Sequence, residues 1–369
     1  MWYLLYIASF CNRLHSELLA AASSFTAITL SAKEDRSAMS SIKEVAKQAN
    51  VSVATVSRVL NNDPVVKPAT KNKVLRVIKE MNYKPNMLAK NLRKQASRTI
   101  VMVLPSMSNP YFSEIARGAQ AAAYDNAYNI IIGTIESKRW ILDTYINMLK
   151  TNLAEGIVFV SSSVNKELLE ELMDEYKIVL CTEYYPGINA TCVAIDNKRA
   201  GYEATKELIR RGCSHIAYIT GNRESSSVTA RIEGYKEALK EAGIPYRPDR
   251  IAGAKNRFDH VKEAVNGIIG QGLPIDGIIT HSDLQASYIL KGIKEKSIAL
   301  PERVGMISFD GTFLAEITNP TITTIVQPLY DLGYTSVHKL ILKLVNESAE
   351  AGEEEGLVLL PHHMVIRET

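Results

Sequence analysis

The chain has 369 residues, of which 46% are hydrophobic and 22% charged, and its formal net charge at pH 7 is +3. That length is sufficient for two or three domains with a sizeable buried core. No apolar run reaches the roughly 18 residues that a membrane helix requires, so we expect no membrane-spanning segment.

The positive charge is concentrated in one short stretch. Residues 41–98 contain 13 Lys and Arg against 3 acidic side chains, a net charge of +10, whereas residues 99–369 carry a net charge of −7. A basic module attached to an acidic body indicates that the basic part binds a polyanion such as DNA.

The four cysteines, Cys11, Cys181, Cys192 and Cys213, form no CxxC pair. Two of them lie within apolar, strand-like runs. We interpret them as small core residues of a protein in a reducing compartment, and we therefore expect a cytoplasmic location, no metal site and no cofactor.

Residues 1–38 do not match the rest of the chain. Their two apolar runs, 1–10 and 18–30, are separated by polar residues, and no basic segment precedes the first run, so a signal peptide fits poorly. Met39 stands directly before the basic stretch. We expect residues 1–38 to be an extension from an upstream start that is absent from the working protein or weakly ordered.

Residues 41–61 have the sequence SIKEVAKQANVSVATVSRVLN. Apolar residues recur at spacings of three and four in 42–49 and again in 53–60, which predicts two short helices with one buried face each. Between them, Asn50 tolerates a left-handed turn and Ser52 is a good N-cap for the second helix. The pattern predicts a helix-turn-helix, followed by a third helix over 69–82.

The second helix of this motif presents small and polar groups that suit the major groove of double-stranded DNA. Arg58 is able to bind guanine through two hydrogen bonds. The alternative interpretation is an ordinary helical hairpin on the protein surface. The candidate DNA-binding residues in this region are Ser52, Val53, Ala54, Thr55, Ser57, Arg58 and Asn61.

From residue 99 onward, short β-branched runs alternate with amphipathic helices. The expected strands begin at 99, 129, 156 and 177 and then, after residue 196, at 215, 276 and 304. Continuous apolar strands between helices indicate parallel sheets that are covered on both faces. We predict an α/β core of two doubly wound parallel-sheet subdomains over 99–369, because this length is large for a single sheet.

The expected domain organisation is an all-α headpiece at 41–85, a hinge helix and linker at 86–98, and the α/β core. Within the core we assign about 99–197 and 328–350 to the first subdomain and about 198–327 and 355–369 to the second. Ligands of open α/β sheets bind beyond the carboxyl ends of the strands. One candidate cleft is therefore expected among residues 105–112, 161–163, 182–185, 221–231, 281–283 and 310–313.

Several motifs, taken in their order along the chain, resemble the LacI/GalR family of bacterial transcription regulators. They are IKEVAKQANVSVATVSRVLN, YKPNMLAKNLR, SNPYF, VAIDN, RIEGY, VGMISFDGT and TTIVQP. The resemblance covers nearly everything from residue 41 to residue 369. It implies a headpiece joined by a hinge helix to a core that is similar to periplasmic sugar-binding proteins. The implied function is a repressor that binds a pseudopalindromic operator as a homodimer under the control of a small-molecule effector.

The resemblance also assigns residues to DNA binding. Val53, Ala54 and Arg58 match the base-reading positions of the family's recognition helix. Leu92 matches the hinge leucine that wedges into the minor groove, and apolar wedges between base steps kink DNA. Asn86 is a further DNA-binding candidate at the start of the same hinge.

For the effector, Tyr111 and Phe112 match aromatic residues of the first strand-end loop. Arg231 and Asp310 match the family's ligand-binding arginine and aspartate. Arg offers a planar fork of donors and Asp two acceptors, which suits sugar hydroxyls or a carboxylate. The remaining candidates for effector contact are Thr182, Asp196, Ser282 and Asp283.

The sequence departs from the family's pattern at two ligand-facing places. Thr182 and Glu183 stand where an Asp-Arg pair is common, and Ser282 precedes Asp283 where many members have Asn. The effector of a relative therefore does not carry over. We expect a sugar or sugar phosphate, with purines as the second class.

Two other functions fit the sequence less well. An extracytoplasmic solute-binding protein shares the core architecture but has neither a headpiece nor a +10 segment. An enzyme, such as a sugar kinase fused to a DNA-binding module, is expected to carry a motif such as GxxxxGK[ST], GxSxG or HExxH, and none of these occurs. We therefore expect a regulator and not an enzyme.

Overall fold

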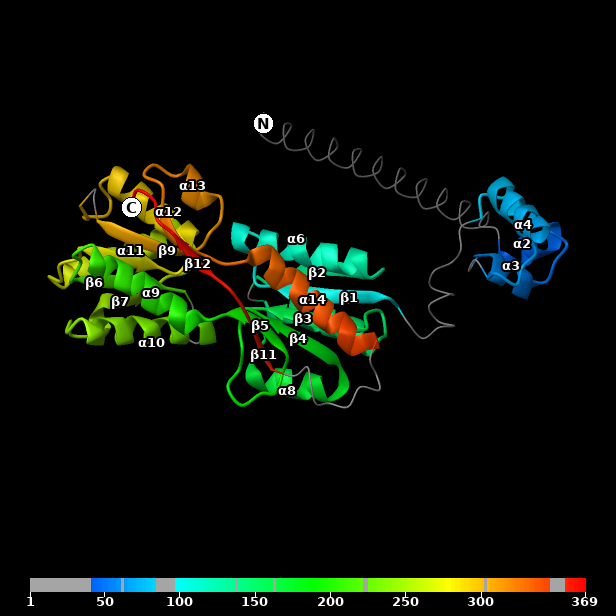
Figure 1. Ribbon diagram of the computed structural model, residues 1–369, viewed down its shortest axis with the longest axis horizontal. Coiled ribbons are helices and arrows are strands. Elements are labelled where there is room, and N and C mark those ends of the chain that lie inside the picture. Colours follow the sequence, from blue (N-terminus) through cyan, green and yellow to red (C-terminus); the bar gives the residue numbers. More distant parts are fainter. Residues whose placement is uncertain are drawn as a thin grey trace, which may run out of the picture. The chain divides into compact units, whose positions relative to one another are not determined.

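The computed structural model describes residues 41–60, 63–83, 97–136, 138–161, 164–221, 225–301, 304–345 and 356–369. The chain divides into two compact units, a helical unit within residues 1–94 and an α/β unit within residues 95–369 (Figure 1). None of the helices in these ranges is long and apolar enough to cross a membrane. The predictions for residues 1–38, Asn61, Asn86 and Leu92 lie outside the described residues.

Within the described residues, the helical unit has the helices α2 (Ile42–Gln48), α3 (Val53–Leu60) and α4 (Pro68–Glu80). A capping box starts α2, in which Ser41 and Glu44 each accept a hydrogen bond from the other's backbone N–H. Asn50 has a φ of 49°. The side chain of Ser52 accepts a hydrogen bond from the backbone N–H of Thr55 at 3.1 Å. The predicted turn and N-cap between the first two helices are both confirmed.

A small core of valine and alanine side chains holds these three helices together. Its buried members are Val45, Ala46, Ala49, Val56, Val59, Val74 and Val77. The third helix was expected over 69–82 and lies at Pro68–Glu80, because Pro68 fits the first helical turn, where a backbone N–H has no intrahelical partner. Since Val56 and Val59 of α3 point into this core, the opposite face of α3 is left for solvent or a partner.

The first subdomain of the α/β unit is built on a six-stranded sheet in the order β11-β5-β4-β3-β1-β2, with all neighbouring strands parallel. Its strands are β1 (Thr99–Leu104), β2 (Asn129–Thr134), β3 (Gly156–Val160), β4 (Lys177–Cys181), β5 (Cys192–Ile195) and β11 (Leu357–Leu360). Its helices are α6 (Pro110–Asp125), α7 (Arg139–Lys150), α8 (Lys166–Glu175) and α14 (Leu329–Val345).

Alternate residues of β1 enter two different cores. Ile100, Met102 and Leu104 pack with α6 and α14, whereas Val101 and Val103 pack with α7 and α8 on the other face. A strand that is buried on both faces needs apolar residues at every position. The continuous apolar run at 99–104 has this physical cause.

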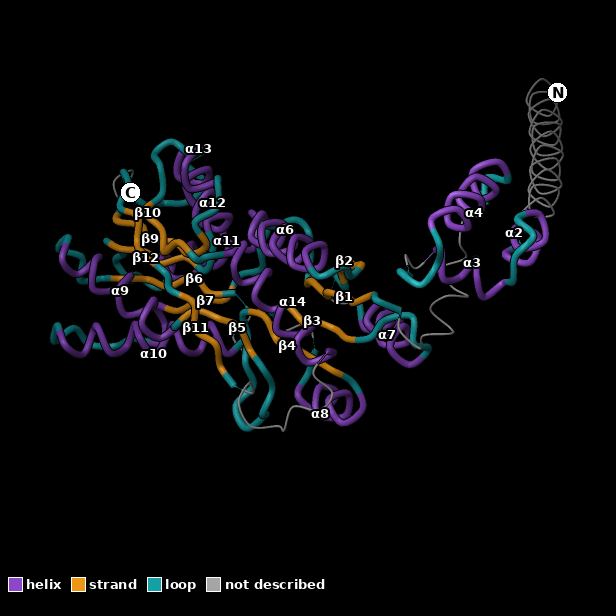
Figure 2. Tube along the Cα trace, turned by 45° about the vertical axis from the view of Figure 1, so that its right-hand side comes forward, coloured by secondary structure: helices purple, strands orange, loops and turns teal. Residues whose placement is uncertain are grey.

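The second subdomain is built on a six-stranded sheet in the order β12-β10-β9-β8-β6-β7. Figure 2 shows helices of this subdomain on both sides of its strands. Its strands are β6 (Ile216–Thr220), β7 (Ile251–Gly253), β8 (Gly277–Thr280), β9 (Gly305–Asp310), β10 (Thr323–Val326) and β12 (His363–Val365). Helices α9 (Asn197–Arg210) and α10 (Ser226–Glu241) cover one face, and α11 (Phe258–Gly270) and α12 (Asp283–Lys294) cover the other. The short helices η1 (Pro248–Arg250) and α13 (Leu314–Ile317) complete it.

The predicted α/β class with two sheets that are covered on both faces is confirmed, and the sheet edges differ from the prediction. Strand β12 runs antiparallel to β10. Residues 355–369 were assigned wholly to the second subdomain, but β11 pairs with β5 in the first sheet, so the chain crosses between subdomains after residue 360. Strands β5, β7, β10, β11 and β12, of three or four residues each, were not predicted.

Cys181, Cys192 and Cys213 are buried free thiols, and Cys11 lies outside the described residues. Burial raises the pKa of the Cys181 thiol to about 12, so the thiol is protonated at neutral pH. These three side chains behave as the small core residues that were predicted. Across the described ranges, no group of His, Cys, Asp and Glu side chains is arranged to hold a metal ion.

Candidate functional site

The outward face of α3 carries the candidate DNA-binding residues of the helical unit. Ser52, Ala54 and Arg58 are exposed, and Val53, Thr55 and Ser57 are half-buried. The side chain of Arg58 is 60% exposed, and its Nε lies 4.0 Å from a carboxylate oxygen of Asp63. That distance leaves its guanidinium donors accessible to a partner.

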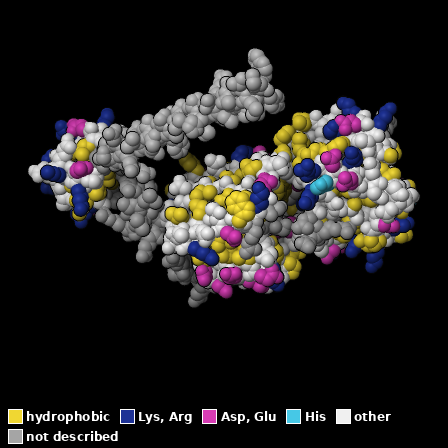
Figure 3. All heavy atoms as spheres, turned by 180° about the vertical axis from the view of Figure 1, so that it is seen from behind, with side chains coloured by type: hydrophobic (Ala, Val, Ile, Leu, Met, Phe, Trp, Pro, Cys, Tyr) yellow, Lys and Arg dark blue, Asp and Glu magenta, His cyan; other side chains and the backbone are white. Residues whose placement is uncertain are grey.

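The two units differ in the charge of their surfaces. Lys and Arg side chains lie across the surface of the helical unit, and acidic side chains gather over α8 of the α/β unit (Figure 3). This distribution agrees with the net charges of +10 and −7 in the sequence. A polyanion is therefore attracted to the helical unit more strongly than to the α/β unit.

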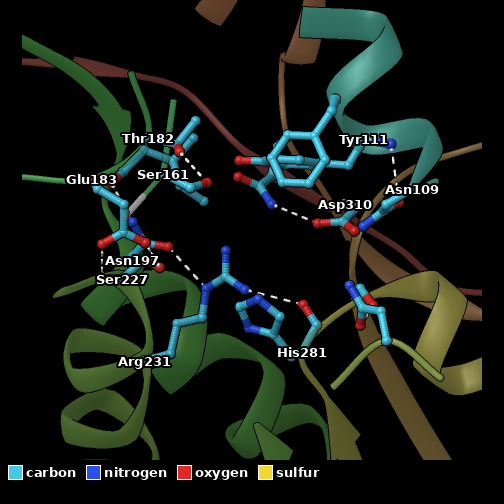
Figure 4. Close-up of a pocket in the computed structure, with 15 residues that line it drawn as sticks. Asn109, Tyr111, Ser161, Thr182, Glu183, Asn197, Ser227, Arg231, His281 and Asp310 are labelled. Carbon is cyan, nitrogen blue, oxygen red and sulfur yellow. Dashed lines mark hydrogen bonds between the residues drawn. The ribbon is translucent and has the colours of Figure 1, made fainter. Parts of the chain in front are cut away.

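A pocket of the α/β unit is lined by residues from both subdomains, at the carboxyl ends of their strands (Figure 4). The space between the lining residues, including a part that is open to solvent, is about 480 Å³. Six of the eight predicted effector-binding residues line it, namely Tyr111, Phe112, Thr182, Arg231, Ser282 and Asp310. The rule that ligands bind beyond the carboxyl ends of the strands, here called the strand-end rule, therefore located the pocket correctly.

The structure does not bring Asp196 and Asp283 into the lining of this pocket. Asp196 is exposed, and its carboxylate accepts a hydrogen bond at 2.8 Å from the backbone N–H of Arg199, which caps α9. Asp283 is fully buried in the first turn of α12. Its carboxylate accepts hydrogen bonds from the hydroxyls of Ser308, Thr312 and Thr324 and from the N–H of Thr312. Both carboxylates therefore accept hydrogen bonds within the fold, and neither residue lines the pocket as was expected from the sequence.

Arg231 is the one cation among the described residues that line the pocket, and its side chain is held on several sides. The residue is 3% exposed. Its Nε donates to Oδ1 of Asn197 at 2.8 Å, and an Nη1 hydrogen is donated to the carbonyl oxygen of His281 at 3.3 Å. The guanidinium carbon lies 4.0 Å from the ring centroid of Phe309, within the range of a cation–π interaction. These contacts orient the guanidinium before any ligand arrives.

Gly201 allows the helix that carries Arg231 to approach α9. A Cβ atom at position 201 would lie 2.2 Å from the carbonyl oxygen and 2.7 Å from the Cα of Arg231. No side chain is compatible with that separation. The position of Arg231 in the pocket therefore depends on a glycine in the neighbouring helix.

Asp310, at the end of β9, is the acceptor of the pocket. It is 4% exposed, and its Oδ1 accepts a hydrogen bond from Nε2 of Gln327 at 3.1 Å. Its Oδ2 is buried and has no hydrogen-bond partner among the described residues. Burial and the nearby charge of Asp283 raise the pKa of Asp310 well above its usual range, and Arg231 and the side chains of Asn109 and Gln327 oppose this shift. Because a buried polar atom without a partner is costly, Oδ2 marks a position for a ligand that donates a hydrogen bond.

His281 is a neutral member of the pocket. Burial, assisted by the charge of Arg231, lowers its pKa to about 3, so the imidazole carries no charge at neutral pH. Its Nδ1 is buried without a hydrogen-bond partner in the described part of the chain. A neutral imidazole has one donor and one acceptor nitrogen, so His281 adds hydrogen-bonding capacity and no charge.

Three residues at the strand ends around the pocket have positive φ angles. Ser161 follows β3 with φ 56°, Thr182 follows β4 with φ 73°, and Asp310 ends β9 with φ 112°. A β-branched residue such as Thr182 rarely adopts this conformation. Backbone strain of this kind persists where the surroundings enforce it, and it is concentrated at functional sites.

Glu183 connects the two subdomains beside the pocket. It follows β4 of the first subdomain, is 6% exposed, and accepts hydrogen bonds from the start of α10 in the second. The donors are the hydroxyl of Ser225, the hydroxyl of Ser226 at 2.7 Å, and the hydroxyl and N–H of Ser227 at 2.6 and 3.2 Å. The N–H of Tyr184 donates in turn to the hydroxyl of Ser226 at 3.1 Å. A carboxylate at a helix N-terminus is electrostatically favoured, so this contact holds the subdomains together.

Apart from Ile195, which ends β5, three pocket residues lie outside the segments after strand ends that the sequence predicts. Asn197 follows β5, Asn256 follows β7 and Gln327 follows β10. These are strands that the apolar pattern did not reveal. The same strand-end rule would have found all three residues if the short strands had been recognised.

Comparisons with known proteins agree with the two units. The model described as "Periplasmic binding proteins and sugar binding domain of LacI family" matches residues 97–368, and the model described as "Bacterial regulatory proteins, lacI family" matches residues 41–86. The transcriptional regulator RegA of Clostridium saccharobutylicum is 33% identical over 332 residues, which span 89% of this chain and 98% of that protein.

Solved structures show the same architecture. A complex of the transcriptional regulator CelR with cellobiose matches with a TM-score of 0.67 at 25% identity, over 89% of this chain and 99% of that one. The Lac repressor dimer bound to operator and the anti-inducer ONPF matches with a TM-score of 0.79 at 20% identity, over 90% of this chain and 99% of that one. At 20% identity, the match to the Lac repressor shows a shared fold and nothing further.

Proposed function

This chain is a DNA-binding transcriptional regulator of the LacI family of bacterial regulatory proteins, and on that premise we propose that it is a homodimeric repressor controlled by a sugar or sugar phosphate. Its matched relatives are named as regulators and not as enzymes. The observation that carries the effector assignment is the buried, unpaired Oδ2 of Asp310 in the same pocket as the guanidinium of Arg231.

The proposed ligand chemistry follows from the lining of the pocket. Arg231 supplies donors and Asp310 supplies acceptors, a combination that suits neighbouring hydroxyl groups on one ring. Tyr111 and Phe112 meet edge to face, with ring centroids 5.1 Å apart, and supply an apolar surface for a ring. The bound cellobiose named for the CelR structure and the sugar-binding description of the matched family support a sugar. Purines remain the second class of candidate.

The proposed operator contact places α3 in the major groove with Arg58 at a base edge. A dimer presents two such helices to two half-sites, which is why a pseudopalindromic operator is expected. Binding to chromosomal operators places the protein in the bacterial cytoplasm.

Control by the effector follows from the position of the pocket. Because its lining comes from both subdomains, a ligand that binds one relative orientation of the subdomains more tightly shifts the population toward it. A change in that orientation within each protomer alters how two paired headpieces meet the operator.

The test is a thermal-shift screen of the full chain with sugars, sugar phosphates and purines, followed by operator binding with and without the compound that stabilises most. A ligand at 100 times its dissociation constant stabilises the folded state by about 2.7 kcal/mol. We expect Asp310→Ala and Arg231→Ala to lose that stabilisation while remaining folded. Unchanged ligand affinity in Asp310→Ala contradicts the assignment of the pocket.

A further inference from the structure

The charged groups of the pocket are unequal in number. Among the described lining residues, Arg231 carries the positive charge, whereas Glu183 and Asp310 are both carboxyl groups. His281 is neutral, since burial and Arg231 lower its pKa to about 3. All of these groups except His281 are less than a tenth exposed, so water screens their charges poorly.

The positive charge of Arg231 is already compensated by the fold. Asn197 and the carbonyl of His281 accept two of its hydrogen bonds, and the ring of Phe309 lies against the guanidinium. Asp310 shares the pocket and is close enough for Arg231 to lower its pKa. A ligand phosphate that approached Arg231 would therefore contact a guanidinium whose hydrogen bonds are partly taken. It would also lie near the carboxyl groups of Glu183 and Asp310.

Hydrogen bonding at Oδ2 of Asp310 also distinguishes a hydroxyl group from a phosphate group. Oδ2 of Asp310 is buried and has no hydrogen-bond partner of ordinary geometry in the described part of the chain. It accepts a hydrogen bond when the carboxyl group is ionised and can donate one when the group is protonated. A hydroxyl group donates and accepts, so it satisfies Oδ2 in either state. A phosphate dianion only accepts, so it pairs with Oδ2 only while that oxygen carries a proton, and an ionised Asp310 repels it.

We infer that the pocket selects a neutral hydroxylated ligand and rejects the same ligand when it carries a phosphate group. This inference rests on the proposed function and narrows it from sugars and sugar phosphates to uncharged sugars or nucleosides. The selection comes from Glu183 and Asp310, which place two carboxyl groups beside the single guanidinium.

Isothermal titration calorimetry on the full chain with matched pairs tests the inference. The pairs are D-ribose and D-ribose 5-phosphate, D-glucose and D-glucose 6-phosphate, and adenosine and adenosine 5′-monophosphate. In the pair whose neutral member binds most tightly, we expect that member to bind at least 100-fold more tightly than the phosphorylated one. A phosphorylated member that binds as tightly as any neutral compound, or more tightly, overturns the inference.

A charge-removing substitution tests the stated cause. Asp310→Asn keeps the shape and one acceptor oxygen, and we expect it to reduce the ratio between neutral and phosphorylated affinities at least 10-fold. Asp196→Asn is the matched control, because it makes the same change on an exposed carboxylate outside the pocket, and its ratio should equal that of the parent. An unchanged ratio in Asp310→Asn, with folding verified by circular dichroism, contradicts the electrostatic explanation.

The proposed function fails on a different result from the same experiments. If Arg231→Ala and Asp310→Asn both bind the neutral compound as the parent does, the ligand lies elsewhere in the protein. If those variants lose the neutral compound while the parent prefers the phosphorylated one, the pocket is correct and the charge selection is wrong.

Discussion

Asp283 and Asp310 are two buried carboxyl groups with different surroundings. Asp283 accepts hydrogen bonds from Ser308, Thr312 and Thr324 and joins α12 to β9 and β10. Asp310 accepts a hydrogen bond from Gln327, and its Oδ2 has no partner of ordinary geometry among the described residues, with the side chain of Asn109 nearby. The first residue therefore supports the pocket from behind its lining, and the second lines the pocket, where we propose that it contacts the ligand.

The raised pKa of Asp310 has a consequence for stability. In the unfolded chain the carboxyl group has its ordinary pKa, and in the folded chain burial and Asp283 raise that pKa well above 3.8. Between these two pKa values the folded state holds more protons than the unfolded state, so the free energy of unfolding decreases as the pH rises. Below the ordinary pKa both states are protonated and this loss is absent.

We therefore expect Asp310→Asn to gain stability relative to the parent as the pH rises. The amide carries no charge at any of these pH values, so it avoids the cost of a buried carboxylate. Urea unfolding of both chains at several pH values from 4 to 8 measures the difference in free energy of unfolding. A difference that stays constant or narrows with increasing pH contradicts the assignment of a raised pKa.

Arg58→Ala is expected to reduce specificity at one operator base pair and to weaken binding there by about 1 to 3 kcal/mol. The reason is that the exposed guanidinium of Arg58 is free to make two hydrogen bonds to guanine. Binding-site selection from a randomised operator measures the effect. Arg76→Ala is the matched control, because it removes the same charge from an exposed position of α4 and should weaken binding without changing base preference. An unchanged preference in Arg58→Ala shows that another residue reads this base.

The functional residues could be predicted from the sequence where a strand end also forms part of the pocket. Asp310, at the end of β9, is an example, whereas Arg231 lies within α10 and was assigned from its match to the family's arginine. Asp196 and Asp283 stand at equally suitable places in the sequence, but each carboxylate is bound within the fold. A carboxylate after a strand serves equally well as a helix cap or as a ligand contact, and the sequence pattern does not distinguish the two.

At the scale of elements, each subdomain contains one pair of helices in very close contact. In the first, a Cβ at Gly118 of α6 would lie 1.9 Å from the carbonyl oxygen of Tyr330, and one at Gly333 of α14 would lie 1.9 Å from that of Ile115. In the second, Gly201 of α9 and Gly234 of α10 allow the same close approach. These glycines are required by backbone proximity rather than by a turn.

Gly201→Ala is expected to destabilise the protein by about 1 to 3 kcal/mol, because the new methyl group overlaps the backbone of Arg231. Gly267→Ala in α11 is the matched control, since a Cβ there meets nothing within 4 Å. The control should gain about 0.5 to 1 kcal/mol from its higher helix propensity. Urea unfolding measures both values, and equal stabilities of the two variants contradict the close packing of α9 on α10.

A second effect of Gly201→Ala concerns the pocket. Movement of α10 displaces Arg231 from Asn197 and His281, so the affinity for the screened ligand should decrease at least tenfold in conditions where the variant is folded. Calorimetric titration measures this affinity. Ligand binding equal to that of Gly267→Ala shows that Arg231 keeps its place without the glycine.

The elements themselves were predictable in proportion to the length of their apolar patterns. Strand β1, with six residues, has a continuous apolar run over 100–104 because both of its faces are buried, and β9, also of six residues, is apolar at Met306, Ile307 and Phe309. Strands β7 and β12 have three residues each and lie at sheet edges, where one side has no neighbouring strand. Their position depends on pairing with distant segments, which a local pattern does not encode.

At the scale of the whole molecule, the chain passes between the two subdomains after β5, after β10 and after β11, as seen in the described residues. Asn197 and Gln327 lie at the first two of these crossings and also line the pocket. A change in the angle between the subdomains therefore alters the same segments that line the pocket. This arrangement allows ligand binding and subdomain orientation to influence each other without a separate relay.

The distribution of charge suggests how operator binding depends on salt. The basic stretch at 41–98 carries a net charge of +10, and the remainder from residue 99 onward carries −7, so phosphate contacts are expected from the headpiece and hinge. Each phosphate that is neutralised contributes about −0.9 to the slope of log affinity against log salt concentration. Two headpieces on one operator should double the slope of a single headpiece.

We expect the full chain to sediment as a homodimer and to bind an operator with two half-sites about 10² to 10⁴-fold more tightly than an operator with one. The reason is that the second headpiece binds at the high effective concentration that linkage provides. Fluorescence anisotropy of both operators between about 50 and 200 mM salt measures the affinities and the slopes. Equal affinities for the two operators, or a monomer at the concentrations that saturate them, contradict the dimer and with it the doubled salt dependence.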